Sequence, residues 1–169
     1  EAYSTYSRKQ MGEFYADEKW ENCLFQIGDE NIYGYGNNVI KVKNSDGVIT
    51  QALFTMDSNA YPKESLWGLL GGYDNIHDNQ VEWYETEIKR MNAENSKVIK
   101  SIQGDVNGGL FKQYGTVKTL AFFHIPLVEM ADAWNEFQEN GFKDTKDFKY
   151  IEGIIGEGGR RVYCGYGED

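Results

Sequence analysis

The sequence lacks the cysteine patterns of zinc-binding or disulfide-rich proteins and the long apolar runs of membrane-spanning proteins. Its two cysteines, Cys23 and Cys164, lie far apart and form no CxxC or Cys/His metal spacing. We therefore interpret them as two separate thiols, which leave the redox compartment undecided. No apolar run approaches the roughly 20 residues that a membrane-crossing helix needs, so we expect no membrane partner.

Basic residues are also scarce. The chain has 17 Lys and Arg residues against 27 Asp and Glu residues, and its formal net charge is −10. An acidic surface repels phosphate backbones unless basic residues cluster. The pair Arg160 and Arg161 and the scattered lysines make no such cluster, so we expect no nucleic-acid partner.

What the chain does contain is typical of a globular domain. Apolar residues make up 40% and aromatic residues 15% of 169 positions, which excludes a disordered or collagen-like chain. The length suits one domain with a real core. We find no internal repeat and no boundary, and predict a single domain over residues 1–169.

The first third of the chain predicts a helix followed by strands. Ser7 and Gln10 have capping-box spacing, and the apolar residues after them share one helical face, so we predict a helix over residues 7–17. Residues 23–26 have the pattern of a short strand.

A hairpin signal follows. Residues 39–42 and 48–56 are apolar and β-branched runs, and turn-forming residues 44–47 separate them. The Asp46-Gly47 pair supplies the positive φ that a tight turn needs. Residues 57–59 then end the second strand, and residues 61–74 are typical of a loop.

The rest of the chain alternates helix and strand signals. Asp78 is a candidate N-cap for a helix with one apolar face, and the glycine-containing stretch 92–115 predicts a long exposed loop. Residues 119–125 form a nearly continuous apolar run, the pattern of a strand that is covered on both faces. An amphipathic helix follows and ends before Gly141. The apolar face of the first helix consists of Val81, Tyr84, Ile88 and Met91. This alternation predicts an α/β layer architecture in which the strand ending at His124 is central.

His124 is the first candidate site residue. It follows the most strand-like segment, and ligands bind at the carboxyl ends of strands in open α/β sheets. A neutral imidazole is a good ligand for a transition metal. The same position also suits a partly buried histidine that only hydrogen-bonds a backbone carbonyl. His77, just before the expected cap Asp78, is predicted to be a surface or cap-associated residue.

Other motif-like stretches do not carry chemistry. Residues 28–30 and 36–38 start like G-D-x-x-D and G-N-H-D metal motifs but lack the second Asp and the His, so we interpret both as turns. The glycine-rich stretch 153–159 lacks the G-K-[ST] ending of a phosphate loop and is interpreted as a loop. No G-x-S-x-G elbow supports a serine hydrolase.

Three segments, taken together, resemble a known family. Residues 54–61 read FTMDSNAY, residues 73–84 read YDNIHDNQVEWY, and residues 120–127 read LAFFHIPL. They are similar to the L-D-S-N-A-Y, Y-D-x-I-x-x-x-Q-x-x-W-Y and A-F-F-H-I-P segments of purple-acid-phosphatase-like bacterial members of the calcineurin-like metallophosphoesterases. The resemblance extends from about residue 7 to the C-terminus and is weakest over residues 92–115.

The resemblance implies a four-layer α/β sandwich that hydrolyses a phosphate ester. In that family two metal ions at the strand ends activate a water for in-line attack on phosphorus. The substrate would be a small phosphorylated molecule, monoester or diester, and the metals could be Fe, Zn, Mn or Mg. His124 matches the lone histidine that the family uses as a metal ligand.

The remaining ligand blocks of the family do not occur in this chain. The blocks D-x-H, G-D-x-x-D and G-N-H-[DE] would precede Glu1, and G-H-x-H would follow Asp169. We therefore expect the chain to be the middle portion of a longer enzyme, inactive by itself and prone to self-association through an uncovered sheet edge. The alternative is a non-catalytic binding or interaction domain on the same scaffold.

Overall fold

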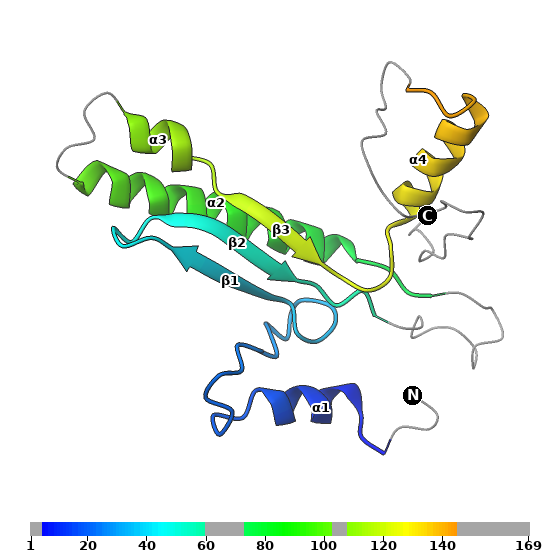
Figure 1. Cartoon of the computed structure of the whole chain (residues 1–169). Coiled ribbons are helices and arrows are strands. Elements are labelled where there is room, and N and C mark those ends of the chain that lie inside the picture. Colours follow the sequence, from blue (N-terminus) through cyan, green and yellow to red (C-terminus); the bar gives the residue numbers. More distant parts are fainter. Residues whose placement is uncertain (1–4, 60–72, 103–107, 145–169) are drawn as a thin grey trace. The chain divides into compact units, whose positions relative to one another are not determined.

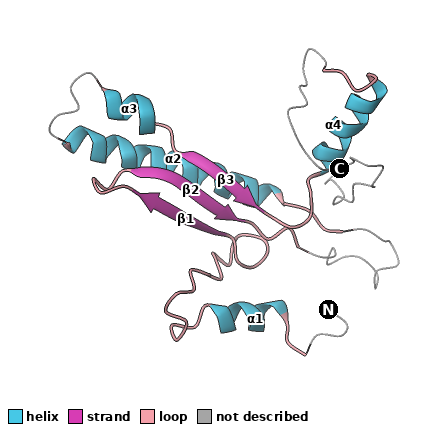
Figure 2. Ribbon diagram, in the orientation of Figure 1, coloured by secondary structure: helices cyan, strands magenta, loops and turns pink. Residues whose placement is uncertain are grey.

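The computed structural model describes residues 5–59, 73–102 and 108–144. Within these residues the chain is a small mixed α/β structure with a three-stranded sheet and four helices (Figures 1 and 2). It forms two compact units, the first made of residues 1–57 and 77–123 and the second of residues 58–76 and 124–169. The α/β class predicted from the sequence is therefore confirmed.

The sheet in the first unit has the order β1-β2-β3. Strands β1 (Asn38–Lys43) and β2 (Ile49–Thr55) pair antiparallel, which confirms the predicted hairpin. The Asn44 side chain holds the turn by accepting hydrogen bonds from two backbone amides, and Gly47 takes the expected positive φ of 80°. Strand β3 (Lys118–Phe122) pairs parallel to β2.

Helix α2 (Asp78–Ser101) packs on one face of this sheet and forms the core with it. The fully buried Phe54 lies edge-on to Trp83 and Tyr84, with ring centroids 5.5 and 4.5 Å away. Edge-to-face contacts of this kind add to the stabilisation from burial. Met91 is also fully buried in the cluster, so the apolar face predicted for this helix is largely the buried one. Val81 is the exception, because it is exposed.

The described parts of residues 92–115, which are 92–102 and 108–115, do not form the long exposed loop predicted from the sequence. Helix α2 continues to Ser101, and a short helix α3 (Gly109–Tyr114) follows. The prediction was wrong because Asn92 and Asn95 interrupt the apolar period. Asn95 is fully buried and hydrogen-bonds the backbones of β2 and α3, while Asn92 accepts the backbone amide of Val117.

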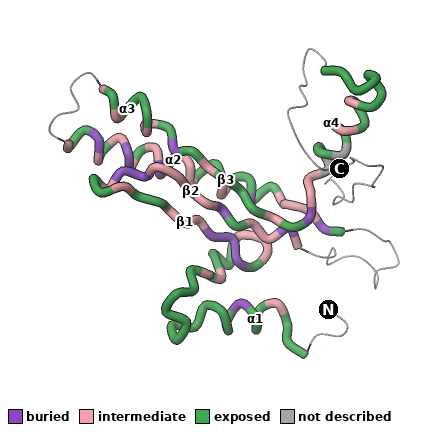
Figure 3. The backbone as a smooth tube through the Cα atoms, viewed as in Figure 1, coloured by how far each residue is buried: buried purple, intermediate pink, exposed green. Residues whose placement is uncertain are grey.

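The expected central strand is present but not central. Strand β3 lies at one edge of the described sheet, and most of its residues are exposed (Figure 3). Leu120 and Phe122 are 48% and 55% exposed. A continuous apolar run predicts a strand that is covered on both faces, but Thr119, which hydrogen-bonds Tyr84 of α2, is the only residue of β3 that is partly buried among the described residues.

Helix α1 (Arg8–Tyr15) begins with the predicted capping box between Ser7 and Gln10. The strand predicted for residues 23–26 is absent, since this segment has no regular structure. Its aromatic residue Phe25 packs closely on Gly36, where a Cβ atom would lie 2.8 Å from the ring. With its φ of 87°, position 36 requires glycine.

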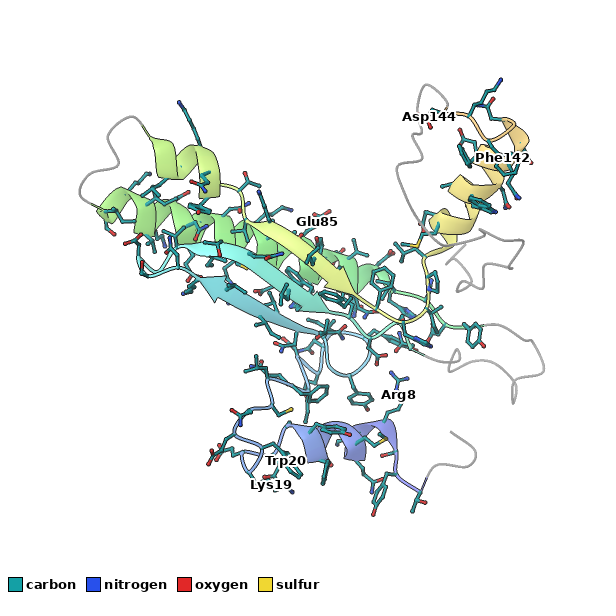
Figure 4. The ribbon with its side chains drawn as sticks, in the orientation of Figure 1. Arg8, Lys19, Trp20, Glu85, Phe142 and Asp144 are labelled. Atoms are coloured by element: carbon teal, nitrogen blue, oxygen red, sulfur yellow. The ribbon has the colours of Figure 1, made fainter. Side chains whose placement is uncertain are left out.

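In the second unit, helix α4 (Val128–Glu139) matches the predicted amphipathic helix and ends before Gly141. Trp134, Phe137 and Phe142 form an aromatic cluster at its C-terminal end, with ring centroids 5.7–6.3 Å apart. Phe142 is labelled in Figure 4. None of the described helices is long and apolar enough to cross a membrane. The glycine-rich stretch 153–159 and most of the expected loop 61–74 lie outside the described residues.

Candidate functional site

His124 lies two residues after strand β3 and is exposed, so it does not have the burial of a core histidine. Its backbone amide donates a hydrogen bond to Ser58 Oγ at 3.2 Å, and the amide of Ile125 donates to the same oxygen at 2.8 Å. Ser58 is only 3% exposed. Ser58 therefore fixes the backbone of this turn while the imidazole stays at the surface.

The environment of Ser58 also bears on the chemistry open to it. A serine nucleophile needs an accessible oxygen and a neighbouring base. Here the hydroxyl oxygen is buried and accepts hydrogen bonds from two backbone amides. The contacts of Ser58 are those of a structural residue.

The first unit contains a polar cluster at the carboxyl end of β2, formed by Asn37, Asp57 and Gln80. Gln80 is fully buried, and its Nε2 donates to Asn37 Oδ1 and to the Asp57 carbonyl, both at 2.8 Å. Asn37 Oδ1 also accepts the Asp57 amide at 3.1 Å. A buried network of this kind fixes the geometry of the segments it joins. It ties the first turn of α2 to the end of β2.

The Asp57 carboxylate in this cluster is paired with a cation. Arg8 of helix α1 forms a salt bridge to it, and the Tyr35 amide donates to the same carboxylate at 2.8 Å. Arg8 is labelled in Figure 4, where its side chain extends from the ribbon of α1. The Asp57 carboxylate therefore holds both α1 and the loop before β1, which is a structural role.

His77 is cap-associated, as the sequence predicts. It is the N-cap residue of α2, and its backbone amide donates to Gln80 Oε1 at 2.9 Å. Its ring stacks on Tyr33 with centroids 3.7 Å apart. The expected cap Asp78 is instead the first residue of the helix.

The two motif-like stretches before β1 are loops, as predicted. Asp29 accepts hydrogen bonds from the backbone and side-chain amides of Asn31 at 2.9 and 2.8 Å. These hydrogen bonds, the backbone one most of all, lower the pKa of Asp29. Gly28 and Gly36 both have a positive φ, and the Gly36 amide donates to the Ile27 carbonyl. The loop uses these polar groups for its own conformation.

The described residues do not by themselves fit a two-metal site. A bridged metal pair needs several His or carboxylate ligands around it. Within residues 5–59, 73–102 and 108–144, no three His, Cys, Asp or Glu side chains gather closely enough to hold a metal. His124 is a single exposed imidazole.

Two surface grooves in the first unit are lined without His124. One, of about 480 Å³, lies beside β1 and α2 and includes Trp83 and Arg90. Arg90 forms a salt bridge with Glu87. The other, of about 610 Å³, lies at the end of α1 beside Phe14 and Trp20. Lys19 sits over both of these rings and pairs with Asp17, so its charge is already compensated.

The three segments that carry the family resemblance contact one another within the units. In the first unit, Gln80 hydrogen-bonds Asp57, and strand β3 pairs with β2 from Gln51 to Thr55. In the second unit, Ser58 holds the turn that contains His124. Sequence reasoning missed Gln80 and Ser58 as contact residues, although both stand at specified positions of the resembling segments.

Comparison with protein-family models, with curated proteins and with solved structures finds no match to this chain.

Proposed function

We propose that the chain is the middle portion of a calcineurin-like phosphoesterase that hydrolyses a small phosphate ester with the help of bound metal ions. His124 would contribute one metal ligand in the intact protein. The observation that carries the proposal is the contact among the three resembling segments. Residues 54–58, 77–84 and 118–125 are joined by strand pairing and hydrogen bonds, so parts of all three resembling segments lie at the carboxyl end of β2.

The position of His124 supports its assignment as a ligand. It follows a strand that runs parallel to β2, and parallel strands present their carboxyl ends at the same edge of a sheet. Ser58 holds its backbone while the residue is exposed. A fixed backbone with an exposed imidazole suits a residue that completes a metal site with ligands from elsewhere.

The layering of the first unit supports the finer architecture that we propose, a four-layer α/β sandwich. Helix α2 covers one face of the sheet. Leu120 and Phe122, on β3, are apolar and exposed. A second sheet on that side would give the two inner layers of such a sandwich.

A non-catalytic binding domain is the second candidate. It is favoured by one observation, that no three metal-ligating side chains gather among the described residues. On this alternative the scaffold would use its surface for binding and need no metal.

The test compares the 169-residue chain with the longer protein that the proposal implies. Both are assayed on a chromogenic phosphomonoester and a diester with added manganese, iron or zinc. We expect metal-dependent hydrolysis by the longer protein and none by the 169-residue chain, because the chain lacks four of the five ligand blocks. Hydrolysis by neither would favour the binding domain. Turnover by the chain comparable to that of the longer protein would show that the site lies within it.

A further inference from the structure

The face of the sheet opposite α2 carries apolar residues from all three strands. The register places Ile40, Leu53 and Leu120 side by side in one row. Val42 lies beside Gln51 and Lys118 in the row on one side, and Phe122 lies beside Thr55 and Asn38 in the row on the other. Alternate residues of a strand point to opposite faces, and Phe54 and Lys41, which contact α2, point the other way. We call these five apolar residues the open face.

The open face is accessible in the first unit. Val42, Leu120 and Phe122 are 42%, 48% and 55% exposed, and Ile40 and Leu53 are partly exposed. Among the described elements of the unit, α2 packs on the sheet from the other side. Contiguous exposed apolar residues are uncommon on monomeric proteins and mark surfaces that bind a partner.

The charge distribution indicates which partner fits. The three strands contain no Asp or Glu, and none occurs anywhere between Asp105 and Glu129, although the whole chain carries a net charge of −10. Two copies of so acidic a chain repel each other over most of their surfaces. The sheet is a place where they can meet without opposing carboxylates.

The edges of the sheet are less suited to association than its face. Strand β1 has the lysines and the irregular register that protect natural sheet edges, with the irregularity between Val42 and Lys43. At the other edge, β3 is only 5 residues long. The Phe122 carbonyl accepts a hydrogen bond from the Met56 amide, just after β2. Because backbone groups alternate in direction along a strand, Thr119 and Ala121 are the β3 residues whose backbone groups point outward.

We propose that two copies of this chain associate through their open faces. The two sheets would stack face to face, as in a β-sandwich, at a separation of roughly 10 Å. The same residues would contribute from each copy, as in a two-fold symmetric dimer. In the longer protein of the proposed function a second sheet of the same chain would take this place, but the dimer of the 169-residue chain does not depend on that function.

Analytical ultracentrifugation of the 169-residue chain tests the proposal. We expect a monomer–dimer equilibrium that tightens as salt is added, since salt screens the repulsion between two acidic chains. The double variant Leu120→Thr/Phe122→Thr keeps β-forming residues but removes two exposed apolar side chains. It should weaken the dimer by about tenfold or more, given the apolar area that is lost from the contact.

Two controls locate the contact. Val81→Thr removes an apolar side chain of similar exposure from α2 and should leave the dimer unchanged. Ala121→Pro blocks a backbone amide that points away from β2 and should also leave it unchanged. Circular dichroism checks that each variant folds, and the single variant Phe122→Thr replaces the double variant if that one unfolds.

Several results would overturn the proposal. These are a monomer at every concentration, a dimer that survives the open-face variants, or open-ended assemblies larger than a dimer. Equal weakening by Val81→Thr would place the contact elsewhere. A dimer that is lost in Ala121→Pro but kept in the open-face variants would assign the association to the β3 edge.

Discussion

The buried side chain of Gln80 joins helix α2 to the end of β2, and its removal tests the polar cluster. Its amide nitrogen donates to Asn37 Oδ1 and to the Asp57 carbonyl, and its amide oxygen accepts the His77 amide at 2.9 Å. Gln80→Ala removes all three hydrogen bonds. At about 0.5–1.5 kcal/mol each, their loss should lower the free energy of unfolding by about 2–4 kcal/mol. The melting temperature of a chain of this size should fall by about 5–15 °C.

Gln80→Glu separates the hydrogen-bonding effect from the loss of volume. The two side chains have nearly the same shape, but an ionised carboxylate cannot donate and would face two oxygen atoms. Burying that charge without a partner costs more than truncation does. At neutral pH this variant should therefore be less stable than Gln80→Ala, and it should recover part of the loss in mild acid, where the carboxylate takes up a proton.

Urea denaturation of each variant measures these differences. Glu82→Ala, at an exposed position two residues further along α2, is the control and should change the stability by less than about 0.5 kcal/mol. A loss of under about 1 kcal/mol in Gln80→Ala would refute the reasoning. So would a Gln80→Glu variant that is as stable as the wild type at neutral pH.

Two further predictions follow from single contacts. Hydrogen bonds from two lysines of β1 lower the pKa of Glu94 from 4.5 to about 2. The wild type should thus exceed Glu94→Gln in stability by about 1–2 kcal/mol above pH 4.5, after allowance for solvent screening. Urea denaturation should show this advantage disappearing as the pH falls from 4.5 to 2, and a constant difference would contradict the pairing. Ser58→Ala should speed amide hydrogen exchange at His124 and Ile125, because both amides lose the hydroxyl oxygen that accepts their hydrogen bonds. Ser58→Thr, which keeps a hydroxyl, should restore protection. Unchanged exchange in Ser58→Ala would contradict the proposal that Ser58 holds this turn.

Elements with local signals could be predicted from the sequence, and elements set by tertiary contacts could not. The Ser7 capping box and the Gly47 turn act through residues a few positions away, so their sequence patterns are complete. The second half of α2 depends on Asn95, a buried polar residue whose side chain hydrogen-bonds the backbones of β2 and α3. Such a residue looks like part of a loop in the sequence.

The candidate site shows the same division. The place of His124 after a strand follows from the apolar run before it, whereas the edge position of β3 depends on pairing that the run does not encode. The Ser58 contact joins residues 66 positions apart, and Gln80 reaches Asn37 over 43 positions. No local pattern predicts hydrogen bonds over such separations.

The metal content of the longer protein carrying His124→Ala is the most direct test of the proposed function. Elemental analysis of the purified variant should show loss of metal relative to the wild type, because one nitrogen ligand is missing. Its melting temperature should change little, since the residue is exposed, and His77→Ala should keep its metal. Full metal content and normal turnover in His124→Ala would contradict the assignment of His124 as a ligand.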